Sequence, residues 1–498
     1  MPDWSYQTVF RPLLFALAPE TARRLTLGAM GKLAGLPGGT WLIDSLGHMR
    51  PPEAVARSVF GLTFPSAVGL AAGLDPSGQA AGAFTQFGFG FLELGPVQLS
   101  RLAAGTWLRS VANETLAHTG VPGASVADVK QRLQHMPKSD MLVGVRIGSP
   151  VGAAPASAAE TVQAVGQALS QADFFSLEIL ANDSWTEQDW SAYLKAAGGT
   201  QRPFLLVFPP DATAERVQRL VRVGLACGAA GAMVAGGVDQ NGVRYEGPGC
   251  LELALQVQAA IQDAAPQPFP VVVATGIHDP ADALRVLDAG AALTAISAGF
   301  VFAGPGLPRR INEAVAIRSA PQHHDPGTGW IYGSFFAAVL LLVGLVTAWV
   351  AVTDLFLPYE IKLGGLEGIQ RFPLLLDFLA HDRISYAGAT LGAASLWFGI
   401  ALYGMRSGEL WARQTLLVCG VLGFLVFLPQ QAHGYFDPLH AGLNVVLLPI
   451  FWLAIRRHRS AALPLSPPAY RRSAAWAAGQ WGQLLVITLG AAMTVTDW

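Results

Sequence analysis

Charged residues are scarce in this chain of 498 residues. Asp, Glu, Lys and Arg make up 13% of it and hydrophobic residues make up 52%, whereas about a quarter of a typical soluble protein is charged. The net charge is −2, and the sequence has no tract rich in Lys or Arg. This pattern excludes the electrostatic signature of a nucleic-acid-binding protein, so we expect no nucleic-acid partner.

Cysteine is also rare, and a cleavable signal peptide is missing. Cys227, Cys250 and Cys419 form no CxxC pair and lack metal-ligand spacing, which indicates structural thiols in a reducing compartment and no metal site. The short apolar stretch 10–17 is followed by Pro19 rather than by a small-residue cleavage site. We therefore expect the N-terminal part of the chain to remain in the cytoplasm.

Long apolar runs without Asp, Glu, Lys or Arg occupy the last third of the chain. A helix of about 20 apolar residues spans the hydrocarbon core of a bilayer. Several such runs in succession, joined by short polar loops, predict an all-α transmembrane domain of about five helices over residues 330–498. The lipid bilayer is then a partner, and the protein is a multi-pass protein of the inner (cytoplasmic) membrane. The runs are 334–353, 384–404, 414–431, 438–455 and 477–496.

The loops between these runs differ in charge. Arginines flank the second loop (Arg406, Arg413) and crowd the fourth (456–472), whereas the third has no Lys or Arg and the first is mainly acidic. Positive charge is retained in the cytoplasm, so the second and fourth loops are expected inside. The same rule places the N-terminal domain inside and the C-terminus outside.

The N-terminal part divides into a short helical segment and a longer α/β region. Residues 1–48 have the periodicity of two amphipathic helices, either a cap on the next domain or a pair of helices on the membrane surface. In residues 49–320 short apolar runs alternate with amphipathic stretches. The sequence therefore predicts a (β/α)₈ TIM barrel, whose catalytic groups lie at the carboxyl ends of the strands. The expected strands are 67–70, 91–94, 142–147, 174–179, 204–208, 231–234, 271–274 and 292–297.

Small residues follow three of these strands. Thr275-Gly276 and Ser297-Ala298-Gly299 come after the last two strands, where backbone N–H groups can bind a phosphate. Ala71, Ala72 and Gly73 end the first strand and allow a planar ring to lie against the backbone. The sequence thus predicts a cofactor or other small-molecule ligand at the mouth of the barrel.

Several motifs resemble those of class 2, quinone-linked dihydroorotate dehydrogenases. They are 61–65 (GLTFP), 68–75 (VGLAAGLD), 87–97 (FGFGFLELGPV, which contains Gly95), 270–277 (PVVVATGI) and 296–305 (ISAGFVFAGP), together with the opening 6–22. The resemblance covers about residues 5–316. It implies a barrel that binds FMN, uses a serine base to oxidise dihydroorotate in pyrimidine biosynthesis, and passes electrons to quinone through the N-terminal helices.

The chain departs from the family pattern where the family binds substrate. The position of the serine base is Ala181, and Ser184 or Asp183 on the same loop could replace it. Glu178 stands where the family has an asparagine. An anion there would repel the carboxylate of dihydroorotate.

Further departures concern the flavin and its surroundings. Pro76 and Val207 replace two lysines, and Gly236-Gly237 replaces an Asn-Thr pair. Arg146 could supply a replacement cation or pair with Glu178. Two functions remain open: an FMN oxidoreductase linked to quinone, or a catalytically inactive barrel that acts as a ligand-binding or scaffold domain for the membrane helices.

Histidines near the outer ends of the apolar runs are the candidates for chemistry in the membrane part. His381, His433 and His440 lie close to acidic residues in the sequence and could form a proton relay or a quinone or metal site. The alternative is that they are helix caps and interfacial anchors.

Overall fold

Eight parallel strands close into a barrel, as the sequence predicts. In the order of their hydrogen bonding they are β3 (Val68–Leu70), β4 (Phe91–Gln98), β8 (Leu142–Ile147), β9 (Phe174–Glu178), β10 (Phe204–Phe208), β11 (Gly231–Ala235), β14 (Val271–Ala274) and β15 (Leu293–Ile296). β15 pairs with β3, and β3 pairs with β4, so the sheet closes on itself. The prediction of a (β/α)₈ barrel is confirmed.

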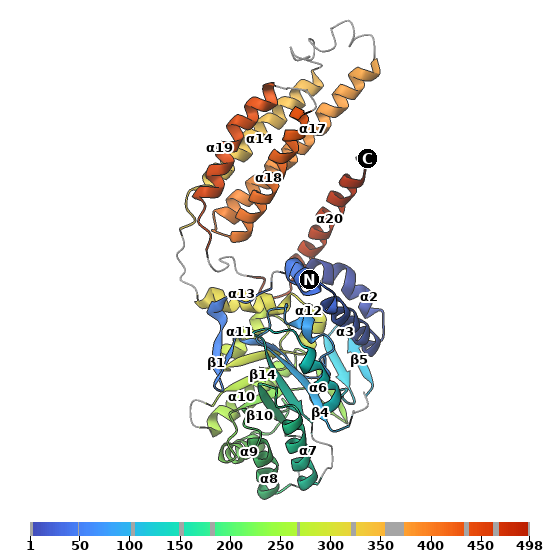
Figure 1. The fold of residues 1–498 in the computed structure, drawn as a ribbon, viewed down its shortest axis with the longest axis vertical. Helices are drawn as coiled ribbons and strands as arrows, with labels where there is room; N and C mark the ends of the chain where they lie inside the picture. The colour runs from blue at the N-terminus through green and yellow to red at the C-terminus, as the bar shows by residue number, and fades with distance from the viewer. Residues whose placement is uncertain are drawn as a thin grey trace. The chain divides into compact units, whose positions relative to one another are not determined.

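The computed structural model describes residues 3–47, 49–100, 105–148, 154–179, 185–265, 269–319, 325–353, 373–432, 438–461 and 468–496. The chain forms two units (Figure 1): residues 1–319 with 468–498, and residues 320–467. The predicted division instead groups all residues from 330 to 498 as one helical domain. The structure separates the last helix from that group and joins it to the barrel unit.

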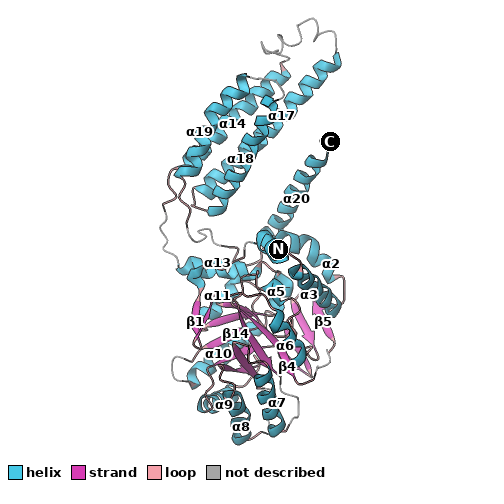
Figure 2. Ribbon diagram, in the orientation of Figure 1, coloured by secondary structure: helices cyan, strands magenta, loops and turns pink. Residues whose placement is uncertain are grey.

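Helices follow the barrel strands and surround the sheet (Figure 2). The short helices are α5 (Ala81–Phe84), α6 (Val126–His135), α11 (Pro280–Asp288) and α12 (Ala298–Ala303). The longer ones are α7 (Pro155–Ala168), α8 (Glu187–Gly198), α9 (Ala214–Ala226), α10 (Cys250–Ala264) and α13 (Leu307–Ser319). Their amphipathic pattern places one apolar face on the sheet; Val217, Leu220 and Val221 of α9 are buried in this way.

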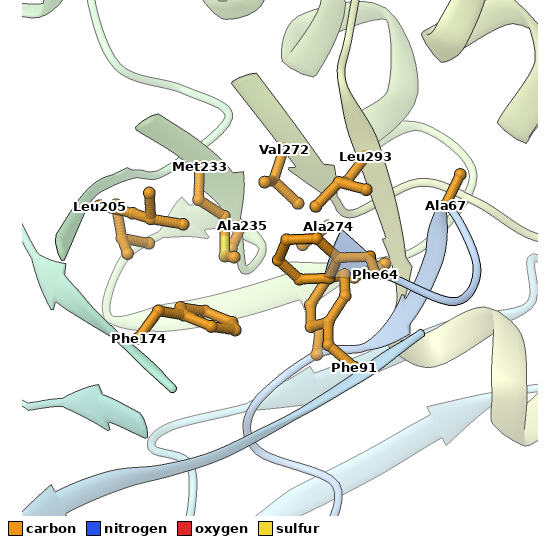
Figure 3. Close-up of a cluster of buried hydrophobic side chains, with 13 residues drawn as sticks. Phe64, Ala67, Phe91, Phe174, Leu205, Met233, Ala235, Val272, Ala274 and Leu293 are labelled. Atoms are coloured by element: carbon orange, nitrogen blue, oxygen red, sulfur yellow. The ribbon is translucent and has the colours of Figure 1, made fainter. Parts of the chain in front are cut away.

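Aromatic rings fill one end of the barrel. The hairpin of β1 (Arg57–Val59) and β2 (Leu62–Phe64) brings Phe64 to within 5.6 Å of Phe91, ring centre to ring centre, and Phe91 lies 5.8 Å from Phe174. Figure 3 shows these rings together with Met233, Val272 and Leu293. Gly69 leaves room for the Phe91 ring, since a Cβ there would lie 2.2 Å from Phe91 Cζ. This end is closed by packing, so the opposite end forms the mouth.

A small antiparallel sheet that the sequence did not reveal lies at the mouth. Its strands, in order, are β12 (Val238–Gln240), β13 (Val243–Glu246), β6 (Thr115–His118) and β5 (Trp107–Ser110). A further short strand, β7 (Ala124–Ser125), extends the pairing of β4.

The N-terminal helices pack on the barrel unit. They are α1 (Asp3–Ser5), η1 (Tyr6–Phe10), α2 (Arg11–Phe15), α3 (Pro19–Gly35) and α4 (Gly39–Gly47). The Tyr6 hydroxyl donates to the Val301 carbonyl of α12, and Gln7 Nε2 donates to the Ala303 carbonyl at 2.9 Å. These contacts support the helical-cap interpretation. Leu13 and Trp41 are 64% and 71% exposed, which leaves apolar surface for a membrane as well.

The C-terminal segment is fastened to the barrel by arginines. Arg472 donates to both carboxylate oxygens of Glu114 and, through Nε, to Asp279 Oδ1 at 3.0 Å. Although burial alone would raise it, the hydrogen bonds from Arg472 and the nearby His278 ring, 3.4 Å away, hold the pKa of Glu114 at about 2, so the carboxylate stays ionised and paired. Helix α20 (Ala474–Thr496) follows, and its Trp476 ring lies 5.0 Å from the Arg310 guanidinium.

Helices make up most of the second unit as far as the structure describes it. It contains α14 (Gly329–Val352), α17 (Pro373–Gly399), η3 (Ile400–Met405), α18 (Leu410–Ala432) and α19 (Pro438–Arg457). Phe336 and Trp397 stack with their ring centres 4.3 Å apart at its core. In the described part of the chain, Gly329–Val352 and Ala380–Met405 are long and apolar enough to cross a membrane. The other three spans and the orientation stay predictions.

Candidate functional site

A cavity of about 320 Å³ opens at the carboxyl ends of the barrel strands. Successive strand ends contribute to its lining, and β6, β12 and β13 close its outer side. Active sites of TIM barrels lie at this end of the fold. The lining residues used below are Ala71, Ala72, His118, Arg146, Glu178, Val207, Ala235, Gly236, Asp239, Arg244, Glu246, Ala274 and Ser297.

Small side chains form the floor of this cavity. Ala71 and Ala72 follow β3, Ala235 and Gly236 end β11, and Ala274 ends β14. None of them extends beyond a methyl group, so a flat ligand can lie directly against the strand ends. The floor therefore fits the ring of a flavin.

A buried ion pair lies at the same level. Glu93 of β4 and Arg146 of β8 are 2.7 Å apart between Oε2 and Nη2, and their side chains are 0% and 7% exposed. The Arg146 Nε also donates to Glu93 Oε1 at 3.1 Å. The Ser176 hydroxyl and the Ala72 backbone N–H complete the hydrogen bonding of the Glu93 carboxylate. Arg146 is thus held rigidly, and it pairs with Glu93 rather than with Glu178.

Glu178 lines the cavity from the end of β9. Burial raises the pKa of its carboxyl, and the positive charges of Arg146 and Arg244 offset part of that increase. Among the described residues Glu178 has no hydrogen-bond or ion-pair partner. Among the carboxyl groups of the described lining, Glu178 is the only one without such a partner.

The predicted cofactor residues divide into two groups. Ala71, Ala72 and Ser297 line the cavity. Gly73 and Gly95 lie behind it, with the Gly73 N–H donating to the Gly95 carbonyl at 2.9 Å. Three of the predicted positions thus lie at the cavity, and their role in binding a cofactor stays a prediction.

The remaining predicted positions, which include Ala298, form a tightly packed edge next to the cavity. The Thr275 hydroxyl donates to the Gly236 carbonyl at 2.7 Å. Gly276 has φ +75°, and a Cβ on Gly299 would lie 1.9 Å from the Ile277 oxygen. Only glycine allows the two loops to approach so closely. A phosphate at this edge would meet backbone and small side chains, since no lysine is among the described lining.

The predicted catalytic positions cannot be placed in the same way. Ala181, Asp183 and Ser184 lie outside the described residues, as does His433. His381 is exposed on α17, and the side chain of His440 on α19 is also outside the description. Within the described residues no group of three His, Cys, Asp or Glu side chains could hold a metal ion.

A second cavity, of about 110 Å³ and mainly apolar, lies between the N-terminal helices and the barrel. Arg109 anchors this junction: its guanidinium lies 4.1 Å from the centre of the Phe15 ring and donates to the Leu17 carbonyl at 3.0 Å. The lining includes Leu14, Phe15, Ala22, Thr26, Leu27, Met30, Phe84, Trp107, Leu116, Phe300 and Val301. This mainly apolar lining suits an apolar group rather than a charged one.

One layer of side chains separates the two cavities. His118 lines the mouth cavity, and its ring stacks on Trp107, which lines the apolar cavity, with 4.6 Å between ring centres. Leu116, two residues earlier on β6, also lines the apolar cavity. His118 Nε2 lies 3.3 Å from Glu246 Oε1. This wall could not be predicted from the sequence, because Trp107, His118 and Glu246 come from three strands, β5, β6 and β13, that pair only in the fold.

Comparisons with known proteins agree with this architecture. No family model matches the chain. The quinone-dependent dihydroorotate dehydrogenase of Chloroflexus aurantiacus is 29% identical over 357 residues, which cover 64% of this chain and 98% of that protein. The enzyme of Methylococcus capsulatus is 28% identical over 355 residues, or 62% and 99% of the two chains.

A solved structure shares the fold. Ligand-free dihydroorotate dehydrogenase from Eimeria tenella superposes with a TM-score of 0.50 at 18% sequence identity and covers 60% of this chain and 94% of that one. The relatives are thus matched almost end to end, while over a third of this chain lies outside the match. The chain is a divergent relative of the quinone-dependent dihydroorotate dehydrogenases that carries an additional C-terminal region.

Proposed function

We propose that this protein is a membrane-bound oxidoreductase that uses FMN at the barrel mouth and passes electrons to quinone in the apolar cavity. The observation that carries the proposal is the wall of His118 and Trp107, which places the two cavities side by side. A ring on the mouth floor and a ring in the apolar cavity would be close enough for electrons to cross one side-chain layer. FMN, when bound, supplies a centre that accepts a hydride and releases electrons.

The chain's own residues would hold the two ligands. Ala71, Ala72 and Ala274 provide the flat surface for the ring, and Arg146, fixed by Glu93, provides a positive charge beside it. Leu27, Met30 and Val301 provide the apolar walls of the quinone cavity. Each group is positioned by packing or by a hydrogen bond, so little rearrangement is required on binding.

The electron donor is a small molecule other than dihydroorotate. Glu178 lines the cavity, so dihydroorotate bound there would bring a second carboxylate into the same cavity. Two carboxylates in one buried site repel each other, and one of them must become neutral. The family's serine base is Ala181 in this sequence, and a methyl group cannot accept a proton.

Several features support attachment to the membrane. Two described helices have the length and composition of membrane spans, and three further apolar runs follow the same pattern in sequence. Arg472, at the end of the arginine-rich fourth loop, bonds directly to the barrel. This bond supports an orientation in which the barrel and that loop share one side of the bilayer, and the positive-inside rule favours the cytoplasmic side.

Purification of the full chain in detergent tests the proposed function. The purified protein should be yellow, and its flavin absorbance should correspond to about one bound flavin per chain. Added dihydroorotate should leave that band unchanged, because this chain replaces the family's serine base and the asparagine side chains that bind its substrate. A colourless protein that ignores added FMN would contradict the proposal. Bleaching of the band by dihydroorotate at an ordinary enzymatic rate would contradict the donor assignment.

A further inference from the structure

Carboxylates outnumber cations around the mouth cavity. The charged groups that line it are Glu178, Asp239, Glu246, Arg146 and Arg244, with His118 beside Glu246. The Glu93 carboxylate lies directly beneath Arg146. Four carboxylates therefore face two guanidinium groups.

Each cation of the described lining already has an acidic partner. Arg146 is bonded to Glu93 through two nitrogen atoms, and Arg244 Nε lies 3.9 Å from Asp239 Oδ2. The adjacent outer groove does not alter this balance, since it is lined by three carboxylates and three arginines: Asp211, Glu215, Asp239, Arg216, Arg219 and Arg244. A negatively charged ligand in the mouth cavity would therefore meet two guanidinium groups that each already have an acidic neighbour.

Glu178 has no hydrogen-bond or ion-pair partner among the described residues. It lines the cavity from the end of β9, and burial raises the pKa of its carboxyl, although Arg146 and Arg244 offset part of that increase. A buried carboxyl group gains most from a ligand that brings a positive charge and N–H donors.

His118 gives a second, independent indication. The side chain is 3% exposed, lines the cavity, and its Nδ1 has no hydrogen-bond partner among the described residues. If Nε2 donates its proton to Glu246, Nδ1 is the unprotonated nitrogen and can only accept a hydrogen bond. At this position the site therefore offers a hydrogen-bond acceptor to a ligand.

We propose that the mouth cavity binds an organic cation, an amidine or an amine, with its charge on Glu178. This inference rests on the proposed function in one respect, namely that the electron donor binds in this cavity. It reverses the charge of the ligand relative to the anionic substrate of the named relatives. Arg146 is itself paired with Glu93, which limits its repulsion of a cation placed near Glu178.

Two probes of the same shape and opposite charge test this inference. Benzamidine and benzoate are both planar, and they differ in carrying an amidinium or a carboxylate group. Titration calorimetry on the purified protein at mildly alkaline pH should give an affinity for benzamidine at least about tenfold higher than for benzoate, the ratio that corresponds to about 1.4 kcal/mol. Orotate should bind no better than benzoate.

Glu178→Gln removes the charge while keeping the shape of the side chain. It should abolish the preference for benzamidine over benzoate. Glu160→Gln, at an exposed position on α7, is the matched control and should retain it. Tighter binding of benzoate than benzamidine by the wild type, or an unchanged preference in Glu178→Gln, overturns the inference. A protein that holds flavin but prefers anions refutes this inference alone, whereas one that prefers cations but holds no flavin refutes the proposed function alone.

Discussion

Replacing Arg146 by methionine should lower the free energy of unfolding by about 3–5 kcal/mol, the cost of leaving a buried charge without its partner. The Glu93 side chain is completely buried and receives two hydrogen bonds from Arg146. Methionine preserves most of the side-chain volume but offers no donor. Denaturant unfolding of the detergent-solubilised protein, followed by tryptophan fluorescence, measures the loss.

The double variant Glu93→Gln, Arg146→Met separates charge from packing. Glutamine keeps hydrogen-bonding atoms for Ser176 and for the Ala72 N–H but carries no charge. It should recover most of the stability that Arg146→Met loses. If the double variant is as unstable as the single one, the ion pair is not what holds this part of the barrel.

Replacing Arg472 by methionine should lower the free energy of unfolding by about 3 kcal/mol and the melting temperature by about 6–12 °C. The Arg472 side chain is 11% exposed and bonds to Glu114 and Asp279, which are 24% and 13% exposed. Without it, two half-buried carboxylates would face each other next to His278. Scanning calorimetry in detergent provides the measurement.

Arg318→Met is the matched control for this prediction. Arg318 pairs with Asp288 in the same unit, but the two side chains are 46% and 54% exposed. Exposed pairs contribute about 0–1 kcal/mol, so the melting temperature should change little. Equal shifts in the two variants would show that Arg472 does not fasten the C-terminal segment to the barrel.

The barrel could be predicted because each of its strands has a local signal in the sequence. The run 271–274 is apolar, is followed by Thr275-Gly276, and precedes an amphipathic stretch that becomes α11. The strands are buried on both faces, as parallel strands are. The antiparallel sheet at the mouth lacks these signals: β5 alternates between partly buried and exposed residues, and β12 is mostly exposed.

The site was only partly predictable because pairing across strands is not local. Glu93 and Arg146 each interrupt an apolar run, which marks both as unusual. Their contact follows from the register of β4 and β8, in which Glu93 lies opposite Gly144. Sequence reasoning considered Arg146 as a partner for Glu178 and did not consider Glu93. His118, Trp107 and Glu246 were missed because they come together from β5, β6 and β13.

The last helix shows where composition alone misleads. Residues 477–496 are as apolar as the runs before them, so the sequence groups them in one domain with those runs. The structure joins α20 to the barrel unit through Arg471 and Arg472, which the sequence had used only as loop charges. Side-chain partners, not hydropathy, determine that assignment.

The central claim is that electrons leave the mouth cavity through the apolar cavity. Thr26→Trp on α3 places a large ring in that cavity, whereas Leu25→Trp on the same helix changes a residue that is 54% exposed and does not line it. The test is to photoreduce the bound flavin and follow its reoxidation by a short-chain quinone in a stopped-flow spectrometer. Reoxidation should slow at least about tenfold in Thr26→Trp, as expected from losing about 1.4 kcal/mol of quinone binding, and stay unchanged in Leu25→Trp. Equal rates in Thr26→Trp and the wild type would contradict the claim.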